Sequence, residues 1–164
     1  TQNVGVGAQS LRSNTVGINN TAIGFASLSG NTTGIQNTAV GTQALQVNTI
    51  GTNNTAVGYL ALTLNTTGIN NTAIGVSSLS GNTTGTQNTA VGMEALKSNT
   101  IALNNVAIGY QALTANTTGG SNVAIGATAL AVNTIGNQNV AIGSSALNAN
   151  TTGANNVGVG HQIP

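Results

Sequence analysis

The chain has almost no charge. Its 164 residues include one acidic side chain, Glu94, and two basic ones, Arg12 and Lys97, so charged residues make up 2% of the composition. A typical globular domain has about a quarter. With a net charge of +1 there is no basic surface for nucleic acid or for an anionic membrane. No apolar run approaches the roughly 18 residues of a membrane span. The sequence therefore predicts neither nucleic-acid binding nor membrane insertion of this segment.

Cysteine and tryptophan are absent as well, and the chain has one histidine, His161. Without cysteine there is no disulfide, no thiol chemistry and no cysteine-based metal site. The one carboxylate and the one histidine fall in different parts of the sequence, so no carboxylate pair, metal cluster or catalytic triad is expected. Serine and threonine are abundant, but no base is available to activate them. We expect no enzymatic activity, no cofactor and no metal.

What the chain does have is a repeat. Residues 20–24 read Asn-Thr-Ala-Ile-Gly, and this pentapeptide returns every 17 residues with Thr/Val and Ile/Val exchanges, without insertion or deletion. A fixed period indicates a solenoid, in which each copy buries its core against its neighbours. We expect a single domain over residues 1–164, with about ten repeats and atypical terminal repeats at 1–7 and 154–164. The last residue of each pentapeptide, the anchor glycine, is Gly7, Gly24, Gly41, Gly58, Gly75, Gly92, Gly109, Gly126, Gly143 and Gly160.

Positions in the repeat can be numbered as columns from the anchor glycine. Column −4 is always Asn and column −1 is always Ile or Val; in every complete repeat column +4 is Leu, +7 is Asn and +8 is Thr, and +10 is Gly except at Ala102. Columns −4 to −1 predict a short strand, and columns +7 to +9 predict a second one that ends at the glycine of column +10. Two glycines per repeat exclude helices, and the hairpin dipeptide Asn-Gly never occurs. The sequence therefore predicts an all-β fold, a parallel β-solenoid or β-roll with one 17-residue coil per repeat.

Stacking the coils places every column on itself. We expect the Ile/Val and Leu columns to form internal aliphatic ridges and the Asn columns to form amide ladders. The Ala of column −2 then faces the other way and packs against another chain, which favours a homo-oligomer. The variable columns +1, +2, +5 and +6 carry every charge and are expected to face outward. At about 4.8 Å per coil the rod is roughly 43 Å long.

Column +1 also holds all three aromatic residues of the chain, Phe25, Tyr59 and Tyr110. Aromatic side chains on a surface can stack on sugars or on a partner protein. These three residues are our candidate surface contacts, and the alternative is that they are isolated surface aromatics. Glu94 and Lys97 are expected to pair weakly on an exposed turn, and His161 is expected at the surface near the end of the rod.

Asn-x-Thr motifs occur throughout the chain. In a secreted eukaryotic protein such motifs would indicate glycans. We instead attribute them to the ladder columns, because a buried asparagine cannot carry a sugar. Examples are Asn19, Asn31, Asn53 and Asn65.

The repeat resembles a known family. Its consensus, Asn-Thr-Ala-Ile-Gly-x-x-Ala-Leu-x-x-Asn-Thr-Thr-Gly-x-Asn, covers residues 3–160. It is similar to the head repeats of YadA-type trimeric autotransporter adhesins and to related repeats of phage and large-virus tail fibres. The resemblance implies a left-handed parallel β-roll, three chains side by side, and an extracellular place on a cell or virion surface. The coil here is a few residues longer, with Ala-Leu-x-x before the second expected strand.

Three functions fit these observations. The first is a structural or adhesive extracellular fibre, or an adhesin head segment, whose variable turns contact a host-surface protein or glycan. The second is an ice-binding solenoid that uses its threonine columns. The third is a subunit that polymerises end to end into a filament, since residues 4–7 and 157–160 both read Val-Gly-Val-Gly without any charge.

Overall fold

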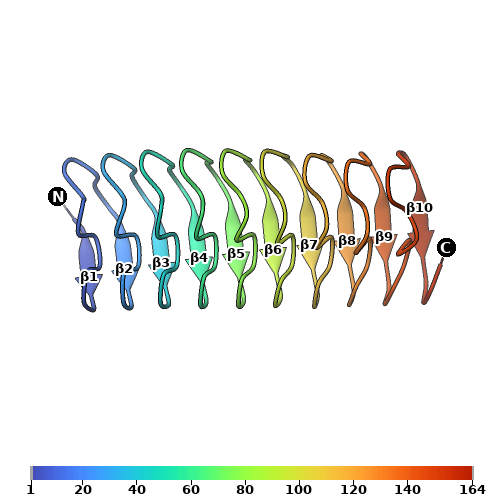
Figure 1. The fold of residues 1–164 in the computed structure, drawn as a ribbon, viewed down its shortest axis with the longest axis horizontal. Coiled ribbons are helices and arrows are strands. Elements are labelled where there is room, and N and C mark those ends of the chain that lie inside the picture. Colours follow the sequence, from blue (N-terminus) through green and yellow to red (C-terminus); the bar gives the residue numbers. More distant parts are fainter. Residues whose placement is uncertain (1, 164) are drawn as a thin grey trace.

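A computed structural model describes residues 2–163 of the chain; residues 1 and 164, the outermost residues of the expected domain, lie outside this range. Ten parallel strands form a single sheet in chain order (Figure 1). Each residue of a strand pairs with the residue 17 positions later, as Ala22 does with Ala39. The predicted all-β parallel solenoid is confirmed, and the described residues contain no helix. The strands are β1 (Val4–Val6), β2 (Thr21–Ile23), β3 (Thr38–Val40), β4 (Thr55–Val57), β5 (Thr72–Ile74), β6 (Thr89–Val91), β7 (Val106–Ile108), β8 (Val123–Ile125), β9 (Val140–Ile142) and β10 (Val157–Val159).

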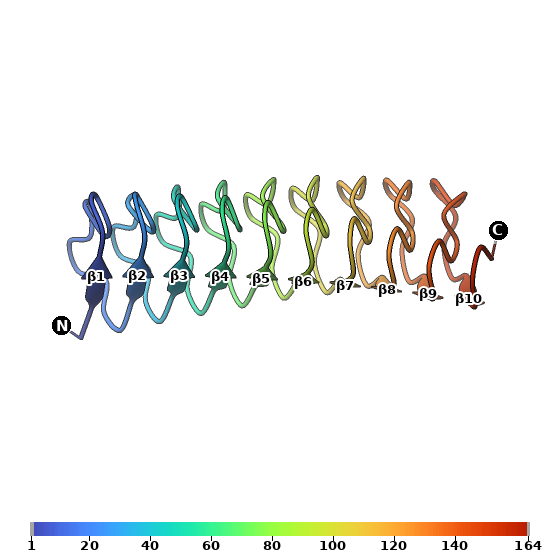
Figure 2. The ribbon, with the colours of Figure 1, turned by 90° about the horizontal axis from the view of Figure 1, so that it is seen from below.

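The coils stand in single file, with the two ends of the chain at opposite ends of the rod (Figure 2). Each coil contains only one strand, so the predicted second strand in columns +7 to +9 is wrong. The reason lies in the hydrogen bonds of this stretch. The carbonyl of Thr49 accepts bonds from three successive backbone amides of the preceding coil, those of Thr32 at 2.9 Å, Thr33 at 3.1 Å and Gly34 at 3.3 Å. Three N–H groups aimed at one oxygen require a curled backbone rather than an extended one.

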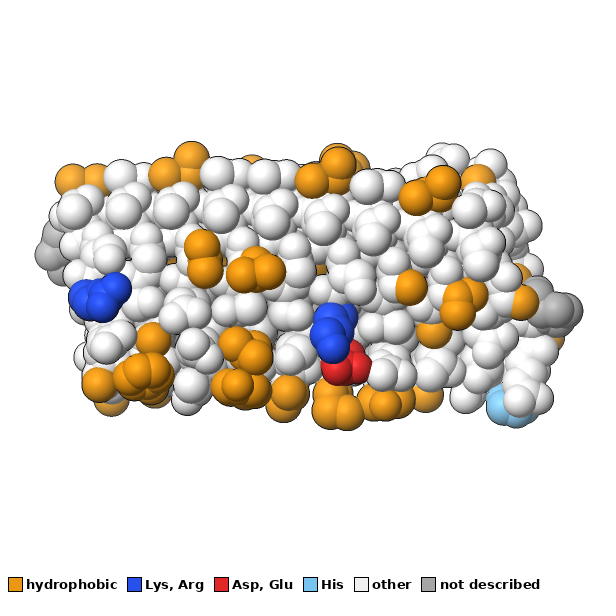
Figure 3. All heavy atoms as spheres, viewed as in Figure 1, with side chains coloured by type: hydrophobic (Ala, Val, Ile, Leu, Met, Phe, Trp, Pro, Cys, Tyr) orange, Lys and Arg blue, Asp and Glu red, His pale blue; other side chains and the backbone are white. Residues whose placement is uncertain are grey.

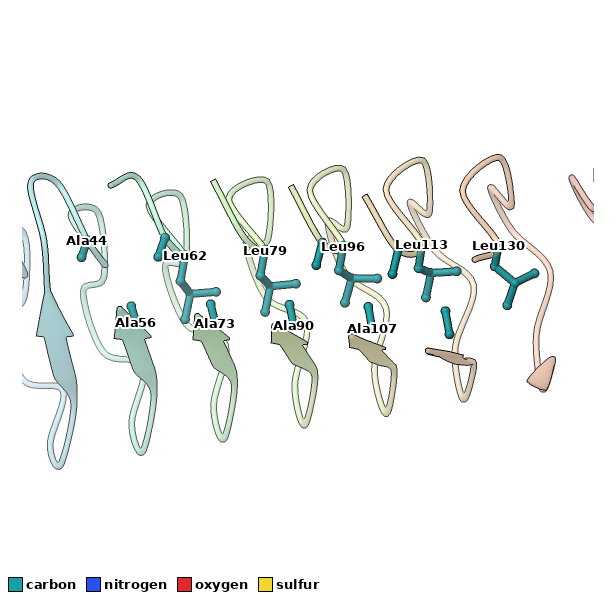
Figure 4. Close-up of a cluster of buried hydrophobic side chains, with 14 of the residues drawn as sticks. Ala44, Ala56, Leu62, Ala73, Leu79, Ala90, Leu96, Ala107, Leu113 and Leu130 are labelled. Atoms are coloured by element: carbon teal, nitrogen blue, oxygen red, sulfur yellow. The ribbon is translucent and has the colours of Figure 1, made fainter. Parts of the chain in front are cut away.

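The core is narrow, and each coil fills it with one leucine and two small residues. Leu62, Leu79 and their equivalents are fully buried, and Figure 4 shows them pointing toward alanines of the strands. The alanine of column −2 therefore faces inward, so the expectation that it packs against another chain is wrong. The prediction that the Ile/Val column lies inside is also wrong, because Ile74 is 40% exposed. Neighbouring side chains of a strand point to opposite faces, so either the alanine or the two β-branched residues must face inward. The leucine that enters from the opposite wall of the coil leaves room only for the methyl group of the alanine.

Turns between these walls use left-handed backbone. Columns +2, +4 and +12 all have positive φ, including the buried leucines, such as Leu79 at 50°. A left-handed conformation costs an ordinary residue about 1–2 kcal/mol, which burial of a leucine side chain, worth about 1.5–3 kcal/mol, offsets. At the anchor positions only glycine fits. Gly41 has φ of 133°, and a Cβ there would lie 2.5 Å from the carbonyl oxygen of Gly58.

Two asparagine ladders run through the interior, as predicted. In column −4, the Oδ1 of Asn20 accepts bonds from both the backbone amide (3.0 Å) and the Nδ2 (3.2 Å) of Asn37. In column +7, Asn48 Nδ2 donates to Asn31 Oδ1 at 2.7 Å. The ladders meet at one acceptor, because Asn37 and Asn48 both donate to the carbonyl of Gly51, at 2.8 and 3.0 Å. No buried side-chain N or O atom of the described residues lacks a partner.

The shared carbonyl explains the second glycine column. A Cβ at Gly51 would collide with Asn48 Oδ1 and would lie 2.5 Å from the carbonyl oxygen of Gly68. Ala102 is the exception in this column, and the ladder is looser there. Its carbonyl lies 3.3 Å from Asn99 Nδ2, compared with 3.0 Å for the equivalent bond at Gly51. The next ladder bond, from Asn116 to Asn99, is 3.2 Å, whereas the bond from Asn99 to Asn82 is 2.8 Å.

Candidate interaction surfaces

The outer face of the sheet carries an unbroken row of β-branched residues. Columns −3 and −1 both point outward, with Thr or Val in the first and Ile or Val in the second. None of these positions is charged. Sequence reasoning missed this face, although the small residue between the two β-branched ones was a usable signal that the interior has little room. The isoleucines of column −1 are 37–40% exposed: Ile23, Ile74, Ile108, Ile125 and Ile142.

The candidate aromatic residues lie along one edge of this face. Phe25, Tyr59 and Tyr110 come two residues after the ends of β2, β4 and β7, and each side chain is about half exposed, at 49%, 51% and 47%. The structure therefore places them at the surface, in one row rather than in one pocket. They are separated by two and three coils, or roughly 10 and 14 Å at the usual strand spacing. What they contact stays a prediction.

Val76 and Met93 occupy the same column between Tyr59 and Tyr110, and both are exposed. The edge of the rod is thus apolar over several consecutive coils. Hydrophobic side chains gather along this edge in the space-filling view (Figure 3), where one basic and one acidic side chain touch each other directly beside it.

Within residues 2–163, the one ion pair forms where it was predicted. Lys97 Nζ lies 2.7 Å from Glu94 Oε1, and Gln111 Nε2 from the next coil donates to Glu94 Oε2 at 2.7 Å. The hydrogen bond from Lys97, followed by that from Gln111, lowers the pKa of the Glu94 carboxyl. An exposed pair of this kind contributes little to stability. His161 lies exposed in the turn after β10, as expected.

No chemistry converges among the described residues. Within residues 2–163, no three His, Asp or Glu side chains lie close enough to hold a metal ion. Glu94 follows β6 and His161 follows β10, so four coils separate them. The arrangement offers hydrogen bonds, apolar contacts and aromatic surfaces, which are the means of binding.

The Asn-x-Thr motifs divide into two groups. Asn31 and Asn65 are in column +7 and are fully buried in the ladder. Asn19 and Asn53 are in column +12, exposed on turns with φ of 59° and 56°. The prediction that these motifs belong to buried ladder asparagines is therefore correct for Asn31 and Asn65 and wrong for Asn19 and Asn53. The column number distinguishes them, because only columns −4 and +7 are ladder columns.

Comparison of the chain with protein-family models, with curated proteins and with solved structures gives no match. The likeness to adhesin heads and tail-fibre repeats stays a prediction based on the repeat motif. No helix in residues 2–163 is long and apolar enough to span a membrane. The function is therefore argued from the surfaces described above.

Proposed function

We propose that this chain is a segment of a structural and adhesive extracellular fibre, on a cell or virion surface, in which three copies pack side by side through the outer faces of their sheets. The observation that carries the proposal is the outward-facing column of isoleucine and valine along the ten strands, which is exposed in seven of them and partly exposed in β3, β4 and β6. Monomeric soluble proteins rarely expose a contiguous apolar surface of more than a few hundred square ångströms, and larger patches mark interaction sites. The number three comes from the adhesin heads that the repeat resembles.

Repetition makes a second copy the best occupant of this face. Every strand pairs with its neighbour in the same register, from Val4 opposite Thr21 to Val140 opposite Val157. Two rods laid side by side therefore present the same side chains at the same spacing, so one favourable contact recurs at each coil. The face has no charged side chain that would oppose the approach of a copy.

The interior suits a stiff rod. Each coil is joined to the next by backbone bonds and by both asparagine ladders, and the buried amides find partners within the chain. Satisfied buried polar networks fix one arrangement, because any other leaves a donor or acceptor without a partner. Such a rod can hold its variable turns at constant spacing, and we assign the adhesive contacts to the edge that carries Phe25, Tyr59 and Tyr110.

The test is the mass of the particle in solution. A triple variant, Ile74→Thr, Val91→Thr and Ile108→Thr, replaces the centre of the apolar column with a residue that strands accept. We expect three chains per particle for the native protein and single chains for the variant, measured by sedimentation equilibrium, with the circular dichroism spectrum unchanged.

A matched control changes three apolar residues of similar size elsewhere on the surface. Val47, Leu64 and Val132 lie in column +6 and are 38%, 48% and 41% exposed. Replacing them with threonine should leave the trimer intact. A native particle with the mass of a single chain would contradict lateral packing. Long filaments that are one solenoid wide would favour the end-to-end filament instead.

Ice binding is the second candidate. Its support is the threonine of column −3, which points outward in five successive strands, β2 to β6, on an uncharged sheet. From β7 onward this column is valine. The threonines of column +8 are already engaged, since Thr32 Oγ1 donates to the carbonyl of Thr49 at 3.0 Å. Thermal hysteresis of the native protein would support this candidate, and its absence would exclude it.

A further inference from the structure

A groove interrupts the regular surface at the corner that precedes β7, β8 and β9. Its volume is about 560 Å³, and it crosses three successive coils in columns +9 to +12. Sites for small molecules usually occupy about 300–1,000 Å³. The groove also lies beside Ala102, the residue that departs from glycine in the second glycine column.

The groove exists because one side chain is missing. Gly120 stands in column +11, where the six preceding repeats each carry a larger residue. The coils on either side have Leu103 and Asn137 in that column, so a gap is left between these two side chains. The larger residues in the preceding repeats are Ile18, Ile35, Thr52, Ile69, Thr86 and Leu103.

The backbone does not require glycine at this position. The φ of Gly120 is outside the left-handed region, and a Cβ there would lie 3.2 Å from the carbonyl oxygen of Leu103 and 3.8 Å from Asn137 Oδ1. Gly41 and Gly51 differ, since added Cβ atoms at those positions collide with the next coil. A larger residue at 120 requires only a small shift of the Leu103 carbonyl, and the same column carries Ile, Thr or Leu in six other coils. The absence of such a residue keeps the groove open.

The walls of the groove combine apolar and hydrogen-bonding groups. Ile101 and Leu103, both about half exposed, supply an apolar side. Thr118, Ser121 and Gln138 supply two hydroxyls and an amide.

The amide of Asn137 is already held in place. Its Oδ1 accepts the backbone amide of Gly120 at 2.7 Å, and its Nδ2 donates to the carbonyl of Ile135 at 3.1 Å. One Nδ2 hydrogen is left for a ligand, because a primary amide has two. A polar group fixed before binding loses little conformational entropy when a ligand arrives.

We propose that this groove binds one unit of a neutral saccharide. The apolar wall matches the C–H face of a sugar ring, and the amides and hydroxyls match its hydroxyl groups, which both donate and accept hydrogen bonds. A charged ligand would find no opposite charge, since no residue lining the groove is ionisable. A saccharide would be the ligand of the adhesive function proposed above, on which this inference rests. The groove is nevertheless separate from the apolar column of the sheet. The sugar measurement and the mass measurement can therefore fail independently.

The test is saturation-transfer NMR on the native protein with the methyl glycosides of glucose, galactose, mannose and N-acetylglucosamine. We expect transfer to at least one of the four. The Gly120→Ile variant fills the groove with an isoleucine side chain, the residue that this column carries at Ile35 and Ile69. It should abolish the transfer. The matched control, Ala154→Ile, makes the same kind of change in the same column outside the groove and should retain it.

Both isoleucine variants are checked for native circular dichroism and native particle mass. Leu103→Ser removes part of the apolar wall without filling the groove, and should weaken transfer even if Gly120→Ile fails to fold. The proposal is overturned if none of the four glycosides receives saturation from the native protein, or if Gly120→Ile and Leu103→Ser both bind as the native chain does.

Discussion

The inside of this solenoid hardly changes from coil to coil, whereas the turn that follows each strand changes in almost every one. Column +7 is asparagine in all nine coils that contain it, while column +1 holds Ala, Phe, Thr, Tyr, Val, Met, Ser and His. The cause is how many copies each side chain contacts. A ladder asparagine bonds to its equivalents above and below, as Asn37 does to Asn20 and Asn54. An outer side chain meets mainly water. The interior therefore specifies the rod, and the outer columns are free to specify what it contacts.

The comparison predicts its largest effect for a ladder residue. Asn71 donates to Asn54 Oδ1 and to the carbonyl of Gly85, and its Oδ1 accepts the backbone amide of Asn88 at 3.0 Å. Asn71→Ala leaves that buried amide without an acceptor and removes several bonds, so we expect a loss of about 3–6 kcal/mol. Denaturant unfolding measures it. Asn148→Ala, at an exposed asparagine, is the control, and equal losses for the two variants would contradict the ladder explanation.

The next largest effect is expected in the leucine column. Leu79→Ala opens a cavity in a fully buried position, which typically costs about 2–5 kcal/mol. Leu64 is 48% exposed in column +6, and the same truncation there should change the free energy of unfolding by about 0.5 kcal/mol or less. If both variants lose the same stability, the assignment of inside and outside is wrong.

Glycine substitutions refine the comparison further. A Cβ at Gly68 would collide with Asn65 Oδ1 and the carbonyl of Gly85, whereas at Gly120 it would make one close contact, 3.2 Å from the carbonyl oxygen of Leu103. Gly68→Ala should cost about 1–3 kcal/mol, as overpacking does, and Gly120→Ala should be close to neutral. Melting temperatures of the two variants provide the measurement. Ala102→Gly, the reverse change in the same column, should shorten the bond from Asn99, visible as a shifted amide resonance, and should raise the melting temperature.

The smallest effect is expected from pH. The pKa of Glu94 is lower in the folded chain than its ordinary value, because Lys97 and Gln111 hydrogen-bond to its carboxylate. The stability this contributes is present above the ordinary pKa and is lost as pH falls through the folded pKa. Glu94 is exposed, so we expect only a slight fall in melting temperature below about pH 4, absent in Glu94→Gln. A large acid transition that persists in Glu94→Gln would contradict this account.

Much of the architecture was predictable because a strict period constrains all coils together. The parallel stacking and both asparagine ladders followed from the invariance of columns −4 and +7. The orientation of the strand did not follow, because hydrophobicity alone placed Ile74 inside and gave no measure of how little space Leu79 leaves. The second strand was predicted from β-branched residues such as Thr32, but three amides converging on one carbonyl turn the chain there.

The surfaces were less predictable than the fold. The row of Phe25, Tyr59 and Tyr110 could be found because a column collects distant residues onto one edge. The groove at Gly120 could not, because a missing side chain in a variable column looks the same in sequence as any other tolerated exchange. Only the positions of Leu103 and Asn137 on either side reveal that a space remains.

The asparagine ladders also give the interior of the rod a direction. In column −4 the amide orientation is set by the backbone, since Asn20 Oδ1 must accept the amide of Asn37 while Asn37 Nδ2 must reach the carbonyl of Gly51. The N–H group of every bond between ladder asparagines thus points toward the N-terminal end. Backbone bonds between coils run both ways but unequally. Gly41 donates backward to Ile23, whereas Thr38 donates forward to Asn54 and the three amides that converge on the carbonyl of Thr49 also donate forward. The ladder dipoles therefore oppose the excess of backbone N–H groups that point forward, so a nearly uncharged rod is expected to align only weakly in an electric field.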